Sequence, residues 1–227
     1  MSGSATDIPE PAVTRLAMYL HILHSFTDRG ILVASSGQLA TAAGVNPAIL
    51  RKDLSHVGAQ GVRGVGYDVG RLTARLAMVL HTDSVHTVAL AGAGHLGRAL
   101  LAHTGHGRGF RVAAMFDADP DLIDTTIEPG GPAIAPLSAI ADVCAGHGAG
   151  AIDVGVIATD DSDAQTACDA FVEAGVRQLL NITPRTLNTE SDVVVRQVDL
   201  ALELQVLAFN ASRPRVTTAS AGQSAGA

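Results

Sequence analysis

Residues 92–97 contain three glycines at the spacing Gly-x-Gly-x-x-Gly. Such glycines permit a tight turn, let the backbone approach a bound group, and let the next helix pack close to a strand. The free N–H groups at the start of that helix, with the positive end of its dipole, attract an anion. The spacing predicts that a nucleotide diphosphate binds at Gly92, Ala93, Gly94, His95, Leu96 and Gly97.

The segments on either side of these glycines must place them between a strand and a helix. Residues 86–91 are mostly apolar, and residues 98–102 are helix formers. Twenty residues after Gly97, a second apolar segment, 112–116, ends at Asp117. A carboxylate at this distance can accept hydrogen bonds from a ribose diol and repel a 2′-phosphate. Together the segments predict a Rossmann unit that binds NAD(H) in preference to NADP(H).

The composition is that of a globular protein, with 47% hydrophobic and 3% aromatic residues among 227. No run approaches the roughly 18 uncharged apolar residues of a membrane span, and the N-terminus lacks a basic region followed by an apolar one. We therefore expect a cytoplasmic protein without a membrane partner. Cys144 and Cys168 lie far apart without metal-ligand spacing, which favours buried thiols and no metal site.

Charge is distributed unevenly along the chain, whose net charge is −7. Residues 1–80 carry seven basic against five acidic side chains, whereas residues 81–227 carry eight against seventeen. A basic N-terminal third is compatible with a polyanionic partner for that part of the chain, although the excess is modest.

The first third of the chain predicts a series of short helices. Apolar residues at three- and four-residue steps indicate a helix over residues 9–28. Ser35 and Gln38 have the spacing of a capping box at the start of a second helix, over 39–43. Asn46, followed by proline, begins a third helix of about ten residues. Two short helices joined by a Gly-containing turn form a helix-turn-helix.

The third helix has two distinct faces at 100° per residue. One arc is apolar and consists of Leu50, Leu54 and Val57, and the opposite arc consists of Ala48, Arg51, Lys52 and Ser55. The apolar face can pack, while guanidinium, ammonium and hydroxyl groups suit phosphate and base-edge contacts in a major groove. On its own, this pattern would favour an ordinary solvated helix.

A glycine-rich segment, 58–67, follows this helix directly. Its small and apolar residues predict a short β-hairpin with Arg63 near the tip, where it could enter a narrow minor groove. Helix-turn-helix and hairpin make a winged helix, which a helix over 70–80 completes, so we expect a DNA-binding domain over residues 8–80. Its expected DNA contacts are Ser35, Ser36, Asn46, Arg51, Lys52, Ser55, Arg63 and Gly64.

The rest of the chain predicts an α/β fold with a doubly wound parallel sheet over residues 85–198. Strands are expected over 151–158, 176–182 and 193–195, and a helix over 163–174. A C-terminal helix over 199–211 is expected to be amphipathic, with Leu200, Leu204 and Leu207 on one side. Residues 1–7 and 212–227 are small and polar, and we expect them to be disordered.

Several short motifs, in their order and spacing, resemble the Rex family of redox-sensing transcriptional repressors. They are Arg51-Lys52-Asp53-Leu54-Ser55, Arg63-Gly64-Val65-Gly66-Tyr67, the glycine loop continued by Arg98-Ala99-Leu100, Phe116-Asp117-Ala118-Asp119-Pro120, Glu173-Ala174-Gly175-Val176, Leu180-Asn181 and Val198-Asp199-Leu200. The resemblance covers about residues 8–209. It implies a homodimer, joined by the exchanged C-terminal helix, that binds an inverted-repeat operator with NAD⁺ or no ligand and releases it with NADH.

The resemblance also implies roles for particular residues. Besides the glycine loop, the residues expected to contact NAD(H) are Asp117, Ala118, Asp119, Thr159, Asp160, Asn181, Ile182 and Thr183. An interdomain switch and dimer contact are expected at His21, Thr104, Asp199 and Leu200. Burial of the nicotinamide at the dimer interface would favour the neutral reduced ring over the charged oxidised ring.

Some positions depart from the family pattern on the sensing side. The arginine of the switch is His21 here, its tyrosine is Thr104, and an aromatic residue of the partner is Leu200. The loop after the fourth strand reads Thr159-Asp160-Asp161-Ser162-Asp163, whose carboxylates either repel a diphosphate or, as we favour, cap the next helix and face water. We therefore expect an NADH response that is weakened, retuned or pH-dependent through His21.

Two other functions are alternatives. A DNA-binding regulator could respond to another adenine nucleotide, such as ADP, ATP or coenzyme A, because the glycine loop recognises phosphates and not the ring. A nicotinamide-dependent oxidoreductase would need a substrate pocket and a positioned proton donor. Residues 81–227 suffice for one Rossmann unit and little else, and they contain no catalytic constellation. We therefore expect a regulator and not an enzyme.

Overall fold

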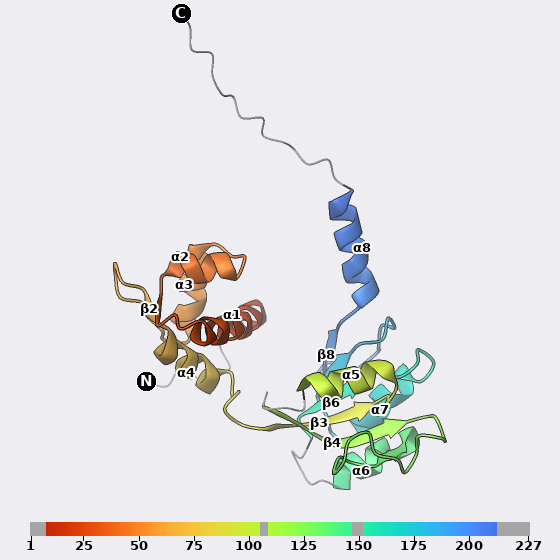
Figure 1. The fold of residues 1–227 in the computed structure, drawn as a ribbon. Helices are drawn as coiled ribbons and strands as arrows, with labels where there is room; N and C mark the ends of the chain where they lie inside the picture. Colours follow the sequence, from red (N-terminus) through yellow and green to blue (C-terminus); the bar gives the residue numbers. More distant parts are fainter. Residues whose placement is uncertain (1–7, 105–108, 147–151, 213–227) are drawn as a thin grey trace, which may run out of the picture. The chain divides into compact units, whose positions relative to one another are not determined.

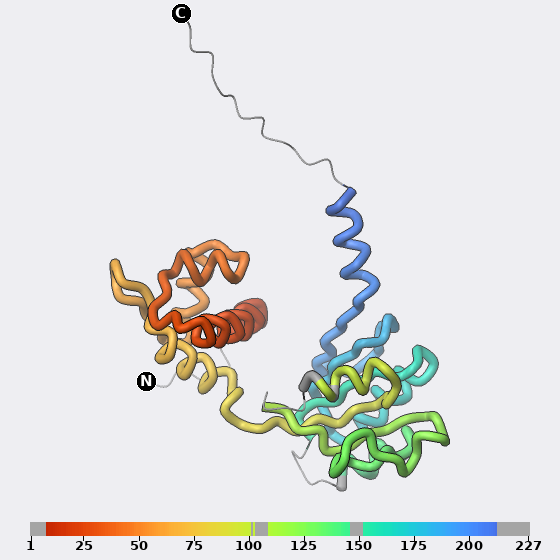
Figure 2. The backbone as a smooth tube through the Cα atoms, in the orientation of Figure 1, coloured from red at the N-terminus to blue at the C-terminus, as the bar shows by residue number. Residues whose placement is uncertain are grey.

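The computed structural model describes residues 8–104, 109–146 and 152–212. The chain divides into two compact units, Met1–Val85 and His86–Ala227. Figure 1 shows helices in the first unit and a sheet flanked by helices in the second, and Figure 2 traces the same backbone. The termini expected to be disordered lie outside the described residues, except Ser212, which is the C-cap of the last helix.

The first unit packs helices around one apolar core. Its elements are α1 (Glu10–Asp28), β1 (Val33–Ala34), α2 (Ser36–Ala42), α3 (Pro47–His56), β2 (Tyr67–Asp68) and α4 (Val69–Val79). Residues from all four of these helices lie fully inside the core, among them Leu16, Leu23, Leu39, Leu50, Leu54 and Leu76. The helices predicted from apolar periodicity are therefore confirmed.

The helix starts depend on the predicted caps. The Ser35 hydroxyl accepts a hydrogen bond from the Gln38 N–H (3.1 Å), and Gln38 Oε1 accepts one from the Ser35 N–H (2.9 Å). Asn46 Oδ1 accepts a hydrogen bond from the Ala48 N–H at the start of α3 (2.7 Å). These contacts confirm the capping box, which fixes the start of α2, and the cap of the third helix, which fixes the end of the turn between α2 and α3.

The wing, residues 58–66, forms the predicted short hairpin. Within it, one antiparallel bridge joins Val62 to Gly66, and the extended residues that follow pair with β1. Gly64 and Gly66 have φ angles of +81° and +114°, which end the extended geometry that a longer ladder needs. A Cβ on Gly66 would collide with the carbonyl oxygen of Ala34. The wing is therefore a short hairpin of one bridge with Arg63 in its turn, as predicted, and it is anchored on β1.

The second unit is a parallel sheet with the strand order β5-β4-β3-β6-β7-β8. The strands are β3 (His86–Ala91), β4 (Phe110–Asp117), β5 (Ile134–Pro136), β6 (Val154–Ile157), β7 (Gln178–Asn181) and β8 (Val194–Gln197). This order confirms the doubly wound α/β fold, in which a crevice forms beyond the carboxyl ends of the strands next to β3. The strand β5, the 3-10 helix Leu137–Ala139 and helix α6 (Ile140–Gly146) were not predicted.

Helices cover both faces of this sheet. Leu100 of α5 (His95–Thr104) packs over one face, with Val88, Leu90 and Met115. Helices α6 and α7 (Ala164–Glu173) cover the other, where Phe171 lies against Phe116 at a ring separation of 6.3 Å. Cys144 and Cys168 are buried free thiols on this second face, as predicted.

The C-terminal helix α8 (Leu200–Ala211) leaves all its residues exposed in the single chain. Leu200, Leu204 and Leu207 share one side, as expected, and are 60–66% exposed. However, Leu202, Val206 and Phe209 form a second apolar side opposite to the first at 100° per residue, and they are 49–67% exposed. The helix is apolar on two faces, so the prediction of a one-sided amphipathic helix was wrong.

Candidate nucleotide and DNA sites

The glycine loop connects β3 to α5, and each glycine has a different environment. A Cβ on Gly92, whose φ is +100°, would collide with the carbonyl oxygen of Ala158, and one on Gly97 would collide with that of Gly92. A Cβ on Gly94 would meet no atom within 4 Å. Gly92 and Gly97 are thus required by the packing of the loop, whereas Gly94 leaves open space at the start of α5 where a diphosphate can approach the backbone.

Asp117 ends β4 and binds the glycine loop directly. Its Oδ2 accepts a hydrogen bond from the Ala93 N–H (2.6 Å), and its Oδ1 accepts one from the Asp119 N–H (2.9 Å). Each oxygen retains a further lone pair, so the half-buried carboxylate can still accept a hydrogen bond from a ribose hydroxyl. Asp119 and Ala118 follow it as exposed residues beside the same crevice.

Arg98 is a loop contact that the sequence analysis missed. Its Nε donates a hydrogen bond to the carbonyl oxygen of Ala93 (2.8 Å), and the residue is exposed in the first turn of α5. A guanidinium held against the glycine loop can balance the charge of a diphosphate. The available signal was a cation directly after the third glycine, on the helix that the loop begins.

The acidic loop, residues 159–163, follows β6. Asp160 and Asp161 are exposed, and the carbonyl oxygen of Asp161 accepts a hydrogen bond from Arg185 Nη1 (3.0 Å). Asp163 is the N-cap residue of α7, yet its side chain makes no capping hydrogen bond. The expected capping by Asp163 was therefore wrong, while Asp160 and Asp161 face water as expected. Thr159 is half-buried, and its hydroxyl donates to the carbonyl oxygen of Asp160 (3.0 Å).

Asn181 and Thr183 form a buried polar network at the end of β7. Asn181 Nδ2 donates to the carbonyl oxygen of Arg185 and to Gln197 Oε1 (both 2.7 Å), and its Oδ1 accepts from the Thr183 N–H and hydroxyl (3.0 and 2.9 Å). The amide of Asn181 therefore uses both its hydrogens within the chain and acts on a ligand through the loop that it shapes. Ile182, between them, is half-buried. Gln197, on β8, was not singled out from the sequence.

The expected switch residues lie in both units. His21 is exposed on α1, and Leu200 is exposed at the start of α8. Asp199 caps α8, because its Oδ1 accepts hydrogen bonds from the N–H groups of Ala201 (2.9 Å) and Leu202 (3.1 Å). Thr104 is the last residue of α5, and its side chain lies outside the described part of the chain.

The expected DNA-contact residues gather on α2, α3 and the wing. Leu50, Leu54 and Val57 are buried as predicted. Arg51, Lys52 and Ser55 lie exposed on α3, and Arg51 Nη1 donates to the Ser36 hydroxyl (3.3 Å). Arg63 and Gly64 are exposed at the turn of the wing. Ser35 and Asn46 use their side-chain oxygens as helix caps, which leaves them at the base of this surface.

Asp53 is a buried acid among these basic residues, and the sequence analysis missed its role. It is 2% exposed, and Tyr19 on α1 donates a hydrogen bond from its hydroxyl to Asp53 Oδ2 (2.9 Å). Burial alone would raise the pKa of Asp53, but the hydrogen bonds from Arg15 and Tyr19 outweigh it and the pKa is lowered. Burial, followed by the hydrogen bond to Asp53, raises the pKa of Tyr19 to about 12.

The described residues contain neither a membrane-spanning helix nor a cluster of metal ligands. Among these residues, no helix is both long and apolar enough to cross a membrane. Within the same ranges, no three side chains of His, Cys, Asp or Glu are grouped as metal ligands.

Two family models match the chain, one in each unit. The model described as "Putative DNA-binding protein N-terminus" matches residues 7–55. The model described as "CoA binding domain" matches residues 83–185. The first match covers α1 to α3, and the second covers the glycine loop and the loops after β6 and β7.

Three crystal structures of RSP, a Rex-family repressor, have the same fold. The structure of RSP alone matches with a TM-score of 0.80 and 27% identity, covering 90% of this chain and 95% of RSP. The structure of RSP with β-NAD⁺ and operator DNA gives a TM-score of 0.79 and 26% identity (90% and 92% covered). The structure of RSP with β-NADH gives a TM-score of 0.78 and 25% identity, covering 90% of this chain and 94% of RSP.

Curated relatives extend this similarity along nearly the whole chain. The redox-sensing transcriptional repressor Rex of Streptomyces griseus subsp. griseus is 44% identical over 207 residues, which is 91% of this chain and 80% of the relative. The Rex protein of Desulfitobacterium hafniense is 38% identical over 209 residues, or 92% of this chain and 97% of the relative. The chain therefore belongs to the Rex family of redox-sensing transcriptional repressors.

Proposed function

We propose that this protein is a transcriptional repressor that senses the NADH/NAD⁺ ratio, as its relatives' names state for them. Two copies would bind an inverted-repeat operator with NAD⁺ or no ligand, and NADH would release them. One observation carries the proposal: a single chain combines an exposed basic helix and wing with a glycine loop whose Gly94 faces open space. It would act as a cytoplasmic regulator without catalytic turnover, metal or membrane partner.

The proposed division of labour follows the chain. Residues 8–80 would bind DNA, residues 85–198 would bind NAD(H), and residues 199–211 would join two copies. The two apolar sides of α8 support the last assignment, because a helix with such exposed surface needs a covering partner in water. Linkage then requires that NADH weakens DNA binding by the same factor by which DNA weakens NADH binding.

The residues of the second unit suit a dinucleotide. The backbone of residues 92–97, with Arg98, would hold the diphosphate. Asp117 would accept hydrogen bonds from the hydroxyls of the adenosine ribose. Thr159, Asp160 and the loop shaped by Asn181, Ile182 and Thr183 would border the nicotinamide. When bound, NAD(H) supplies a ring whose charge differs between its two redox forms. The residues around the nicotinamide would bind the neutral and the charged ring with different affinity.

The test is fluorescence anisotropy of the purified protein on a labelled inverted-repeat operator at fixed salt, because phosphate contacts make the affinity steeply salt-dependent. NADH is titrated with and without NAD⁺. Release by low micromolar NADH, opposed by NAD⁺, is the expected result. Tight DNA binding that NADH does not change would overturn the sensing half of the proposal.

A second candidate function keeps DNA binding but takes another adenine nucleotide as ligand. It is supported by the exposed carboxylates of Asp160 and Asp161 and by the match to a coenzyme A-binding model. The same titration with ADP, ATP and coenzyme A separates the two candidates. Equal affinity for NADH and ADP would favour the second.

A further inference from the structure

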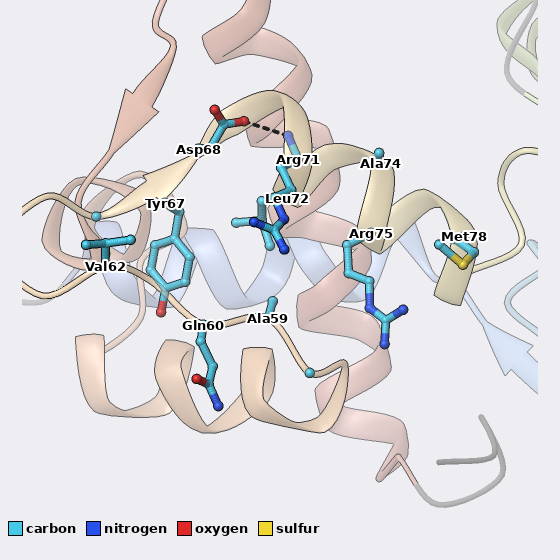
Figure 3. Close-up of a pocket in the computed structure, with 12 residues that line it drawn as sticks. Ala59, Gln60, Val62, Tyr67, Asp68, Arg71, Leu72, Ala74, Arg75 and Met78 are labelled. Atoms are coloured by element: carbon cyan, nitrogen blue, oxygen red, sulfur yellow. Dashed lines mark hydrogen bonds between the residues drawn. The ribbon is translucent and has the colours of Figure 1, made fainter. Parts of the chain in front are cut away.

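A cavity of about 610 Å³ lies between the wing and α4 in the first unit (Figure 3). Ala59, Gln60 and Val62 line it from the wing, and Arg71, Leu72 and Arg75 line it from α4. Figure 3 shows both arginine side chains reaching from α4 toward the segment that holds Ala59 and Gln60. None of the contacts assigned above to DNA or to the nucleotide uses this cavity.

The two guanidinium groups are held on one side of α4. Arg71 and Arg75 are four residues apart, so they share a helix face. Arg75 Nε donates to the carbonyl oxygen of Val57 at the C-cap of α3 (2.6 Å), which fixes the guanidinium and leaves its terminal nitrogens available. Within the described residues, the guanidinium of Arg71 makes no hydrogen bond and neither arginine makes an ion pair.

The cavity lining contains two guanidinium groups and one carboxylate, so it retains a net positive charge. Like charges four residues apart on a helix repel each other. The acid on the rim of the cavity is Asp68, and its Oδ1 is engaged by the Arg71 N–H (2.7 Å) as the cap of α4. Planar guanidinium donors on one helix face recognise an oxyanion, and phosphate is the oxyanion that they bind best in two-pronged geometry.

We propose that Arg71 and Arg75 bind a backbone phosphate of the operator beside the minor groove that Arg63 enters. This inference rests on the proposed function. The wing forms one wall of the cavity, and phosphates line both edges of a minor groove that is only about 6 Å wide. Val62 and Gly66, which are bridged on either side of the turn that bears Arg63, line the same cavity, so it adjoins the surface expected to contact DNA.

The test measures how operator affinity depends on salt. Each phosphate contact contributes about −0.9 to the slope of log K against log [salt]. For R71Q/R75Q, we expect the slope to become less negative by about 2, because each of the two bound copies loses one phosphate contact, with equal loss on operator and on scrambled DNA. Arg111→Gln, an exposed arginine of the second unit, is the matched control and should keep the wild-type slope. An unchanged slope in R71Q/R75Q, with unchanged thermal stability, overturns the inference.

A second measurement locates the contact on the DNA. Operator duplexes carry a neutral methylphosphonate at one phosphate at a time beside the wing site. Wild type should lose about tenfold in affinity at one position, and R71Q/R75Q should lose nothing further there. If the methylphosphonate lowers the affinity of R71Q/R75Q by the same factor as that of wild type, the inference is overturned. If wild type and Arg111→Gln do not bind the operator at all, the proposed function fails as well, which separates the two failures.

Discussion

Arg15 on α1 donates two hydrogen bonds to the carboxylate of Asp53 on α3, from Nε to Oδ2 (2.7 Å) and from Nη2 to Oδ1 (2.8 Å). The pair therefore fixes the buried side of the helix whose exposed side carries Arg51 and Lys52. Because α1 also presents His21 to solvent, the pair joins the basic helix to the helix that bears the expected switch residue.

Replacing Asp53 by asparagine should weaken the first unit without removing any DNA contact. The change leaves the Arg15 charge without its partner, which we expect to lower the free energy of unfolding by roughly 2 kcal/mol. Operator affinity should fall because α3 is less firmly held, while the salt slope stays that of wild type because the phosphate contacts remain. Urea unfolding and anisotropy at several salt concentrations check both parts; a reduced slope would mean that Asp53 acts on phosphate contacts.

The same carboxylate should make stability fall in acid. Its folded-state pKa is lowered, against about 3.9 for an unfolded aspartate. A lowered pKa gives stability that is present above the unfolded value and is lost as pH falls through the folded value. Wild type should therefore lose more stability than Asp53→Asn below about pH 4. Unfolding curves at pH 6 and at pH 3 test this, and parallel losses in the two proteins would contradict it.

The phenol of Tyr19 gives the opposite sign at high pH. Its pKa is raised to about 12, so the folded state favours the neutral phenol. The resulting stability is present below the unfolded value of about 10 and is lost as pH rises toward the folded value. Tyr19→Phe should lose less stability than wild type between pH 9 and pH 11, as measured by thermal unfolding at each pH. An identical dependence in both proteins would show that Tyr19 does not titrate with unfolding.

Gly92 and Gly94 of the glycine loop should respond differently to alanine. Gly92→Ala places a Cβ on the Ala158 carbonyl oxygen at a φ of +100°, so we expect a loss of at least about 2 kcal/mol in stability. Gly94→Ala has free space and should fold normally, but its methyl group would meet the diphosphate and weaken NADH binding at least tenfold. Thermal unfolding and NADH fluorescence separate the two effects; normal NADH binding in Gly94→Ala would place the diphosphate elsewhere.

The local signals in the sequence were sufficient for the helices of the first unit and for the glycine loop. Ser35, Gln38 and Asn46 cap helices through neighbours two or three residues away, and the glycine spacing acts within a few residues. Such contacts depend only on nearby residue types, so they can be predicted from one sequence. The doubly wound parallel sheet followed from the alternation of strands and helices in the second unit.

The contacts that were missed join residues far apart in the sequence. Arg15 and Asp53 are separated by 38 positions, and Asn181 and Gln197 by 16. The pairing of the strand after the wing with Val33 and Ala34 was missed for the same reason. One available signal was the position of Asp53 at the edge of the apolar arc of α3, where an acid needs a buried partner.

His21→Arg should sharpen the response to NADH. His21 is exposed on α1, so an arginine fits there without repacking and restores the fixed charge of the family pattern. We expect a lower NADH concentration for half-release of the operator, with little change in stability. His24→Arg, also exposed on α1, is the control. An NADH response equal to that of wild type would show that position 21 does not take part in sensing.

The two apolar sides of α8 should both matter for dimerisation. Leu204→Glu and Phe209→Glu each place a charge on one of these sides, and both should shift the protein toward monomers. Operator affinity should then fall about 100-fold or more, because the two half-sites are no longer bound together. Light scattering coupled to gel filtration measures the mass. Gln205→Glu adds the same charge at a polar position and should remain dimeric.

The hydrogen bond from the Ala93 N–H to Asp117 determines which end of the dinucleotide can distinguish its redox forms. A loop that this hydrogen bond already holds loses little conformational entropy when a ligand binds. It therefore binds the adenosine diphosphate end of different ligands in the same way. NAD⁺ and NADH share that end and differ only in the nicotinamide. The glycine loop thus contributes equally to the affinity for NAD⁺ and for NADH. The residues at the nicotinamide end of the crevice must distinguish the two redox forms.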